Sequence, residues 1–144
     1  MGKLAVHVKR LRATARLPER ATEGATGYDL YACLAAPLDV GQEPVRVPTG
    51  IAIEAPTGLD VQIRPRSGLS SKGVMVMLGT IDSDYRGELL VTMFVLPYRG
   101  THTVNDGDRI AQLVISRVED VRLAEADGLS ATTRDTSGHG STGR

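Results

Sequence analysis

The segment GTIDSDYRGE, residues 79–88, gathers side chains that can do chemistry between two apolar stretches. Asp82 and Asp84 are two positions apart, and the aromatic ring of Tyr85 follows directly. One interpretation is a polar turn that closes a hairpin, with Tyr85 packed on it. The other is an active site in which a carboxylate acts as a general base toward water and the ring closes over a sugar. Metal binding by Asp82, Asp84 and Glu88 is a third interpretation, but Mg²⁺ and Ca²⁺ need convergent oxygen ligands and this spacing does not ensure them.

Two other segments have the composition of anion sites. In RPRSGLSSKG, residues 64–73, Arg66 ends an apolar-polar alternation and a short helical turn follows. A guanidinium would then lie beside free backbone N–H groups, which suits an anion, although a solvated turn is the alternative. In SGHGSTG, residues 137–143, glycines expose the backbone and hydroxyls donate hydrogen bonds, with Arg134 nearby. This segment is either a phosphate site or a low-complexity tail.

The stretches that must position these segments are predicted to be β-strands. Apolar and polar residues alternate, or form short apolar runs between turns, in five stretches. They are residues 4–11, 45–56, 59–66, 89–96 and 109–118. Only residues 67–73 indicate a helix, a single turn that Ser67 would cap and Gly73 would end. Many short strands separated by Pro and Gly predict an all-β, jelly-roll-type sandwich or barrel with one short helix.

Length and charge limit the classes of function. A chain of 144 residues forms one ordinary domain, and 17 Lys plus Arg balance 17 Asp plus Glu. A formal charge of zero provides no field that attracts nucleic acid or a membrane surface, so neither is expected as a partner. No run approaches the roughly 20 apolar residues that span a bilayer. The three histidines, His7, His102 and His139, lie in separate segments without the spacing of zinc ligands.

The cysteine content and the N-terminus favour a cytoplasmic location. Cys33 is the only cysteine, so it cannot form an internal disulfide, and we expect it to be a small buried hydrophobe. The stretch MGKLAVHVKRL lacks the long apolar region of a signal peptide. Both features fit a reducing compartment.

The C-terminal stretch differs from the rest of the chain. After Leu129 it has no large apolar residue and is rich in Gly, Ser and Thr, so it cannot bury enough surface to order itself. We therefore divide the chain into a β core, residues 1–123, and a C-terminal arm, residues 124–144. The arm is either disordered or becomes ordered on something else.

Taken in order, these segments resemble the trimeric dUTPase family, the dUTP diphosphatases, and the resemblance covers almost the whole chain. That family has five motifs. The matching stretches are ATGYDLYA (25–32), PRSGLSSKG (65–73), GTIDSDYRGE (79–88), GDRIAQLVI (107–115) and RDTSGHGSTG (134–143). The resemblance implies a jelly-roll subunit that assembles as a homotrimer, with three active sites each built from all three chains. It also implies that the arm reaches across to a neighbouring subunit and orders over bound nucleotide.

The reaction implied by the resemblance is Mg²⁺-dependent hydrolysis of dUTP to dUMP and pyrophosphate, with water attacking the α-phosphorus. This reaction would limit uracil in DNA and supply dUMP for thymidylate synthesis. Asp82 is implied to hold and deprotonate the water and to accept a hydrogen bond from the sugar 3′-OH. The Tyr85 ring is implied to pack on the deoxyribose and leave no space for a 2′-OH. Backbone groups of Gly79, Thr80 and Ile81 would read the uracil edge.

The resemblance assigns the remaining site residues to the triphosphate, the base and the metal. Arg66, Ser67 and Gly68 would bind the α- and β-phosphates, and Gln112 another phosphate oxygen. The substrate-binding residues implied in the arm are Arg134, Ser141 and Thr142 at the γ-phosphate, with His139 and Gly140 beside them. Mg²⁺ would be chelated chiefly by the three phosphates and by water, and Asp29 would touch it through water at most.

Three positions depart from the family pattern. His139 replaces the Phe that stacks on uracil; an imidazole can also stack, but its charge brings in pH dependence. Asp135 replaces a Gly and adds negative charge beside the γ-phosphate site. Val76 replaces an Asn found in many bacterial members, which leaves recognition of the base to the backbone.

Two alternatives share the same fold. A dCTP deaminase-like enzyme relies on a catalytic Glu in a differently spelled third motif and lacks the Gly-rich arm, so SGHGSTG argues against it. A non-catalytic deoxynucleotide-binding regulator would keep the fold without turnover. Asp82 and its neighbours, which stand here in the form that the enzymes use, argue against that second alternative.

Overall fold

Short antiparallel strands make up the body of the protein in the computed structural model, which describes residues 2–141 and 143. The strands are β1 His7–Arg10, β2 Tyr28–Tyr31, β3 Leu38–Val40, β4 Val45–Pro48, β5 Ile51–Glu54, β6 Leu59–Arg64, β7 Val74–Val76, β8 Gly79–Ile81, β9 Leu90–Val95, β10 His102–Val104 and β11 Arg109–Arg117. The helical elements are α1 Ser67–Ser70 and a 3-10 turn, η1 Pro97–Arg99. This composition confirms the all-β fold class with one short α-helix.

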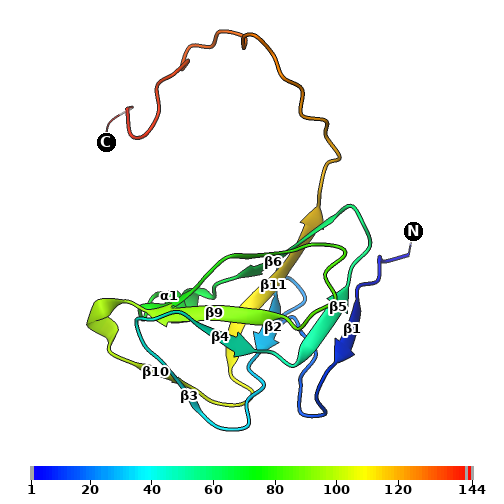
Figure 1. Cartoon of the computed structure of the whole chain (residues 1–144), viewed down its shortest axis with the longest axis vertical. Helices are drawn as coiled ribbons and strands as arrows, with labels where there is room; N and C mark the ends of the chain where they lie inside the picture. Colours follow the sequence, from blue (N-terminus) through cyan, green and yellow to red (C-terminus); the bar gives the residue numbers. More distant parts are fainter. Residues whose placement is uncertain (1, 142, 144) are drawn as a thin grey trace.

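The strands form one four-stranded sheet, one three-stranded sheet and two ribbons. Their orders are β2-β11-β6-β8, β4-β9-β7, β1-β5 and β10-β3. Apolar residues from both larger sheets join one buried cluster, which includes Val61 and Ile63 of β6, Leu113 of β11 and Met93 of β9. Figure 1 shows the sheets stacked across this core, with β9 in front of β6 and β11. Period-two alternation therefore placed the core face of β6 correctly.

Two local predictions need correction. The N-cap of α1 is Arg66, which is extended and makes no side-chain cap hydrogen bond, so the predicted cap at Ser67 is wrong. Ser67 falls inside the helix because Arg66 already has the extended backbone that an N-cap requires. The first strand is also shorter than predicted. It pairs only with β5, whose last residue, Glu54, lies opposite His7, so Leu4 extends beyond its partner strand.

The segment 79–88 is not a hairpin between paired strands, and that prediction is wrong. Strand β8 pairs with β6 in the four-stranded sheet, whereas β9 pairs with β4 and β7 in the three-stranded sheet. The buried Leu89 donates its N–H to the carbonyl of Ile51 at 2.8 Å. The chain therefore crosses from one sheet to the other, and residues 82–88, which we call the Asp82 loop, bridge the two.

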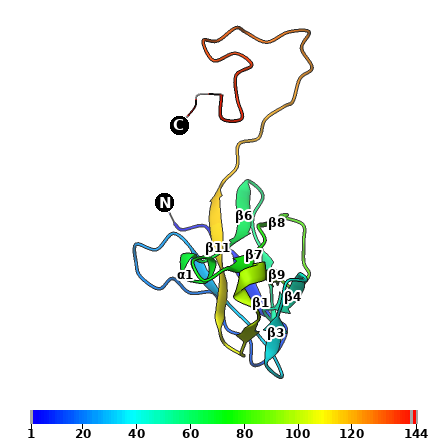
Figure 2. The same ribbon diagram turned by 90° about the vertical axis from the view of Figure 1, so that its left-hand side faces the viewer.

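The C-terminal segment leaves the body of the protein after β11. The last backbone hydrogen bond to the core runs from the Val118 N–H to the Gly58 carbonyl at 3.1 Å. Figures 1 and 2 show the following chain extending well away from the sheets. Within residues 119–141 and 143 there is no strand or helix. The division into a core of residues 1–123 and an arm of residues 124–144 stays a prediction. In the described part of the chain, no helix has the length and apolar character needed to cross a membrane.

Candidate active site

Three charged side chains and one amide gather where β2 and β6 end and β11 begins, a cluster that we call the arginine corner (Asp29, Arg66, Arg109 and Gln112). The Asp29 side chain is only 14% exposed, and its Oδ1 lies 3.4 Å from Nε of Arg66. Its Oδ2 lies 3.7 Å from Nη1 of Arg109. Arg66 Nη1 also donates to the Arg109 carbonyl at 3.0 Å. Two guanidiniums share one carboxylate, so the corner has a net positive charge that suits an anionic ligand.

Gln112 is fixed in the same corner by backbone geometry. Gln112 lies on β11, opposite Asp29 of β2 on one side and Arg64 of β6 on the other. Its Nε2 donates to the Pro65 carbonyl at 2.9 Å. A Cβ at Gly27 would lie 2.1 Å from Gln112 Oε1, so only glycine there leaves room for this amide. The structure thus brings Asp29, Arg66 and Gln112 together, with the exposed Ser67 and Gly68 directly after Arg66.

The Asp82 loop forms a second candidate centre. Ile81 packs against the core, whereas Thr80 and Asp82 are exposed, as the alternation of β8 predicts. Tyr85 donates its N–H to the Asp82 carbonyl at 3.1 Å, which closes a turn at the tip. A pocket of about 180 Å³ lies here, lined by Thr80, Ile81, Asp82, Tyr85, Glu88, Leu89 and Leu90. Sites for whole drug-sized ligands measure roughly 300 to 1,000 Å³, so this pocket suits only part of such a ligand.

The two centres lie at opposite ends of β6. Antiparallel pairing places Ile81 beside Val61 and Gly79 beside Ile63, so Asp82 continues toward the start of β6. Arg66 lies two residues beyond its other end. Six residues of extended chain between the level of Asp82 and Arg66 correspond to roughly 20 Å. One copy of the chain therefore does not bring Asp82 next to the arginine corner.

The predicted arm residues lie far from both centres. Arg134 Nε donates to the Ser137 carbonyl at 2.8 Å, and Ser141 donates its N–H to the Gly138 carbonyl at 3.0 Å. Within residues 134–141 and 143, the recorded hydrogen bonds stay inside the arm. His139 and Gly140 have φ values of 52° and 86°, and Asp135 has 45°. Asp tolerates this left-handed conformation better than most side chains, which fits a position that glycine otherwise favours. Thr142 lies outside the described residues.

Sequence reasoning missed two side chains of these centres. Arg109 was not assigned a role, although it opens β11 and shares Asp29 with Arg66. Its position in GDRIAQLVI, the stretch that also contains Gln112, could have indicated a role in the site. Glu88 enters the sequence analysis only in the metal interpretation of the loop, yet its carboxylate pairs with Arg12 and accepts the Gly50 N–H at 2.9 Å. Nothing in the local sequence indicates that contact, because its partners are 76 and 38 residues away.

A large apolar groove lies on the face of the four-stranded sheet. Its volume is about 510 Å³, and its lining is Leu4, Val6, Val8, Leu17, Pro18, Arg20, Thr26, Tyr28, Leu59, Leu113 and Ile115. The chain just after β11 is also apolar and exposed: Val121 is 70% exposed and Leu123 is 94% exposed. Exposed apolar surface of this extent is typical of a protein interface.

The side chains of the arginine corner are compatible with a Mg²⁺ ion that binds as part of an anionic ligand. Among residues 2–141 and 143, no three His, Cys, Asp or Glu side chains gather as a metal site. Asp29 is the carboxylate of the arginine corner, and both its oxygens face guanidiniums. Mg²⁺ keeps several waters and binds phosphates readily, so contact with Asp29 through water is compatible with this donor set.

Comparison with known proteins gives one consistent family. The dUTPase family model matches residues 13–143. The deoxyuridine 5′-triphosphate nucleotidohydrolase of Hydrogenobaculum sp. is 49% identical over 139 residues, which cover 94% of this chain and 96% of that protein. A mutant Staphylococcus bacteriophage 80alpha dUTPase with dUpNHpp superimposes with a TM-score of 0.85 at 27% identity, covering 97% of this chain and 99% of that one. A mutant dUTPase from phage phi11 of S. aureus, whose structure reveals the coordination of a structural Mg(II) ion, has a TM-score of 0.77 at 26% identity and covers 86% and 97%.

Proposed function

This chain belongs to the dUTPase family and hydrolyses dUTP to dUMP, and from that premise we propose an active site shared between copies of the chain. The Asp82 loop of one copy would meet the arginine corner of a second and the arm of a third. The observation that carries this proposal is the separation of Asp82 and Arg66 along β6, roughly 20 Å within one copy. Both must reach the same nucleotide if the reaction needs a base and a phosphate site. A closed ring of three copies provides such an arrangement by symmetry.

Exposed apolar surface supports the homotrimer. The groove on the β2-β11-β6 face and the exposed Val121 and Leu123 leave apolar area in water in the isolated chain. Burial of apolar area contributes about 25 cal/mol per Å², so contact between copies at these surfaces is favourable. An arm exchanged between copies would also carry Arg134 and His139 toward a neighbouring site.

Asp82 is proposed as the catalytic base. Its exposed carboxylate holds a water molecule and takes a proton from it as the water oxygen bonds to the α-phosphorus. The bond from the α-phosphorus to the bridging oxygen breaks, so pyrophosphate leaves and dUMP remains. A carboxylate is a weak base, so much of the effect of Asp82 would come from positioning the water. The same carboxylate accepts a hydrogen bond from the sugar 3′-OH.

The edge of β8 is proposed to read the base. β8 is the last strand of its sheet, so backbone groups of Gly79, Thr80 and Ile81 that point away from β6 are available to uracil. A backbone donor that faces uracil O4 would meet the N4 amine of cytosine, which leaves polar groups unpaired at about 1 to 3 kcal/mol each. Val76 is buried on β7, which is consistent with recognition by the backbone. The Tyr85 ring packs on the deoxyribose.

The arginine corner is proposed to bind the triphosphate with its metal. Arg66, Ser67 and Gly68 bind the α- and β-phosphates, and Gln112 another phosphate oxygen. The arm adds Arg134, Ser141 and Thr142 at the γ-phosphate, with His139 on the base and Gly140 beside it. Mg²⁺, when bound to the phosphates, would neutralise part of their charge. Asp29 would contact the hydrated ion through water while it keeps Arg66 and Arg109 in place.

The cellular setting follows from the reaction and the cysteine. Hydrolysis of dUTP would limit uracil in DNA and provide dUMP for thymidylate synthesis, which suits a cytoplasmic enzyme. Cys33 is a buried free thiol, with its Sγ 3.4 Å from Oγ1 of Thr14, and a reducing compartment would preserve it.

Pyrophosphate release from dUTP, dCTP, dTTP and UTP, compared under Mg²⁺, tests the function. We expect kcat/KM for dUTP to exceed that for each other nucleotide by about 100-fold or more. Deamination of dCTP would favour the deaminase-like alternative. Binding of dUTP without pyrophosphate release would favour the non-catalytic regulator.

A further inference from the structure

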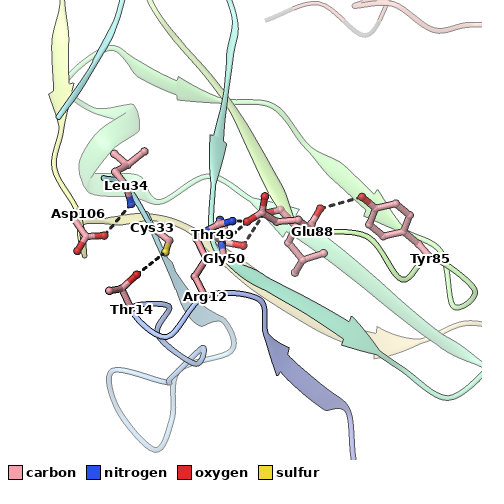
Figure 3. Close-up of polar contacts among 10 residues, drawn as sticks. Arg12, Thr14, Cys33, Leu34, Thr49, Gly50, Tyr85, Glu88 and Asp106 are labelled. Carbon is pink, nitrogen blue, oxygen red and sulfur yellow. Dashed lines mark hydrogen bonds and ion pairs between the residues drawn. The ribbon is translucent and has the colours of Figure 1, made fainter. Parts of the chain in front are cut away.

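Glu88, the last residue of the Asp82 loop, makes contacts through both its side chain and its backbone. Its carboxylate pairs with the Arg12 guanidinium and accepts the Gly50 N–H at 2.9 Å. Its backbone carbonyl accepts the phenol of Tyr85 at 3.0 Å. Figure 3 shows the carboxylate pointing toward Gly50 and Arg12 and the Tyr85 hydroxyl approaching from the opposite side. One residue thus connects the loop aromatic to the core.

The core side of this connection is rigid. Gly50 has a φ of 70°, and a Cβ there would lie 2.8 Å from both Ala15 Cβ and Cys33 Sγ, so the β4-β5 turn is tightly packed. The buried Thr49 Oγ1 donates to the Leu89 carbonyl at 2.6 Å. The neighbouring Cys33 and Glu88 side chains raise the pKa of Arg12, which favours the charged form that pairs with Glu88. The C-terminal end of the loop is therefore fastened to a part of the molecule that has little freedom to move.

The Tyr85 ring lies directly against Gly87. A Cβ added to Gly87 would lie 2.3 Å from the Tyr85 hydroxyl oxygen and 2.5 Å from Cζ. Both distances are far below van der Waals contact, so any larger residue at 87 must displace the ring. The ring is thus confined between the Gly87 backbone and the Glu88 carbonyl, although Tyr85 itself is 43% exposed.

We propose that Glu88 is a positioning residue and that Gly87 determines specificity, because together they fix the Tyr85 ring where it excludes the 2′-OH of ribonucleotides. This inference rests on the proposed function of Tyr85 at the deoxyribose. It adds that sugar discrimination depends on the connection from the core through Glu88 as well as on the aromatic ring. A ring released from this connection would move aside for a ribose.

The ratio of kcat/KM for dUTP to kcat/KM for UTP, measured with the full chain under Mg²⁺, tests the inference. We expect this ratio to fall about tenfold in Glu88→Ala, which removes the contacts to Gly50 and Arg12, and in Gly87→Ala, which displaces the ring. Glu88→Gln keeps an acceptor oxygen for both contacts and should restore most of the ratio. Glu54→Gln is the matched control, since Glu54 pairs with Arg86 of the same loop at 3.2 Å. It should leave the ratio unchanged. Thermal unfolding of each variant identifies those that fold.

Tyr85→Ala separates this inference from the proposed function. A lower ratio in Tyr85→Ala and in a folded Glu88→Ala or Gly87→Ala supports the inference. If Tyr85→Ala lowers the ratio but the folded Glu88→Ala variant stays within about twofold of the parent, the inference is overturned and the role of Tyr85 stands. A parental ratio in Tyr85→Ala overturns both. A general loss of stability would lower both kcat/KM values together and leave their ratio unchanged, which also counts against the inference.

Discussion

The two ends of β6 are organised in different ways. At one end the arginine corner is part of the sheet, where strand register places Asp29 and Gln112 and two ion pairs orient Arg66 and Arg109. At the other end the Asp82 loop runs between two sheets, and its side chains contact the core behind its tip, through Arg86 with Glu54 and through Glu88 with Arg12 and Gly50. The corner, which we propose as the phosphate site, is therefore held in place within one copy. The loop presents Asp82 to the outside, where a neighbouring copy can supply what its own chain does not.

The largest expected effect is at the loop. Asp82→Ala should lower pyrophosphate release by about 10³-fold, because the proposed general base is lost, and weaken binding of a non-hydrolysable dUTP analogue by only about tenfold, because one hydrogen bond to the sugar is lost as well. Steady-state kinetics and calorimetric binding measure the two quantities. Asp84→Ala, an exposed acid on the same loop, is the matched control and should retain activity. Unchanged turnover in Asp82→Ala would remove Asp82 as the base.

Removal of the arm should have the next largest effect. A chain that ends at Thr133 lacks Arg134 and the Gly-rich stretch, so it should lose about 100-fold in kcat/KM for dUTP, as expected when several phosphate donors are removed. The arm from residue 134 makes no recorded hydrogen bond to the core in the described residues, so the molecular mass of the assembly should not change. Light scattering measures the mass, and full activity in the truncated protein would refute the role of the arm.

A smaller effect is expected at the corner. Arg66→Ala removes charge-assisted hydrogen bonds to phosphate worth about 1.5 to 3 kcal/mol, so KM for dUTP should rise about 10- to 100-fold with a smaller change in kcat. Arg64→Ala is the control, because Arg64 lies two residues before Arg66 and its exposed side chain bonds only to Gln62 among the described residues. Equal KM values in the two variants would show that the corner is not the phosphate site.

The smallest expected effect is on stability and concerns His102 on β10, which lies at neither end of β6. Its pKa is lowered, mainly by burial and also by the nearby Arg99, so protonation costs more in the folded than in the unfolded chain. Its contribution to stability is present above the unfolded pKa of about 6.5 and is lost as the pH falls from that value through the lower pKa of the folded chain. Because His102 is only partly buried, solvent screening should keep the loss under about 1 kcal/mol. The free energies of unfolding of the parent and of His102→Gln, compared at pH 5 and pH 8, check this. A parent that is more stable relative to the variant at pH 5 than at pH 8 would contradict it.

Much of the fold was predictable because it depends on local patterns. Alternation in 59–66 and the apolar run in 109–118 predicted β6 and β11, and the buried face of β6 is as expected. The prediction of a hairpin at 79–88 was wrong because strand pairing is a long-range property. β8 pairs with β6, and the Leu89 backbone bonds to Thr49 and Ile51 around the β4-β5 turn. Local sequence contains no information on such partners.

The candidate site was predictable only as separate pieces. Motif resemblance identified Arg66, Gln112 and Asp82 as site residues, and their roles stay proposals. That Asp82 and Arg66 lie at opposite ends of one strand follows from register and was not visible in the sequence. The contact of Glu88 with Arg12 was equally hidden, since 76 residues separate them.

Subunit mixing tests the shared active site most directly. Asp82→Ala and Arg66→Ala chains are unfolded together, refolded in equal amounts and assayed for pyrophosphate release at a dUTP concentration below KM, where each variant alone is impaired. In a ring of three, a site that takes its loop from one copy and its corner from the next is intact in about one quarter of cases, so the mixture should recover about one quarter of the parent activity. A mixture no more active than the average of the two separate variants would show that each site is built within a single chain.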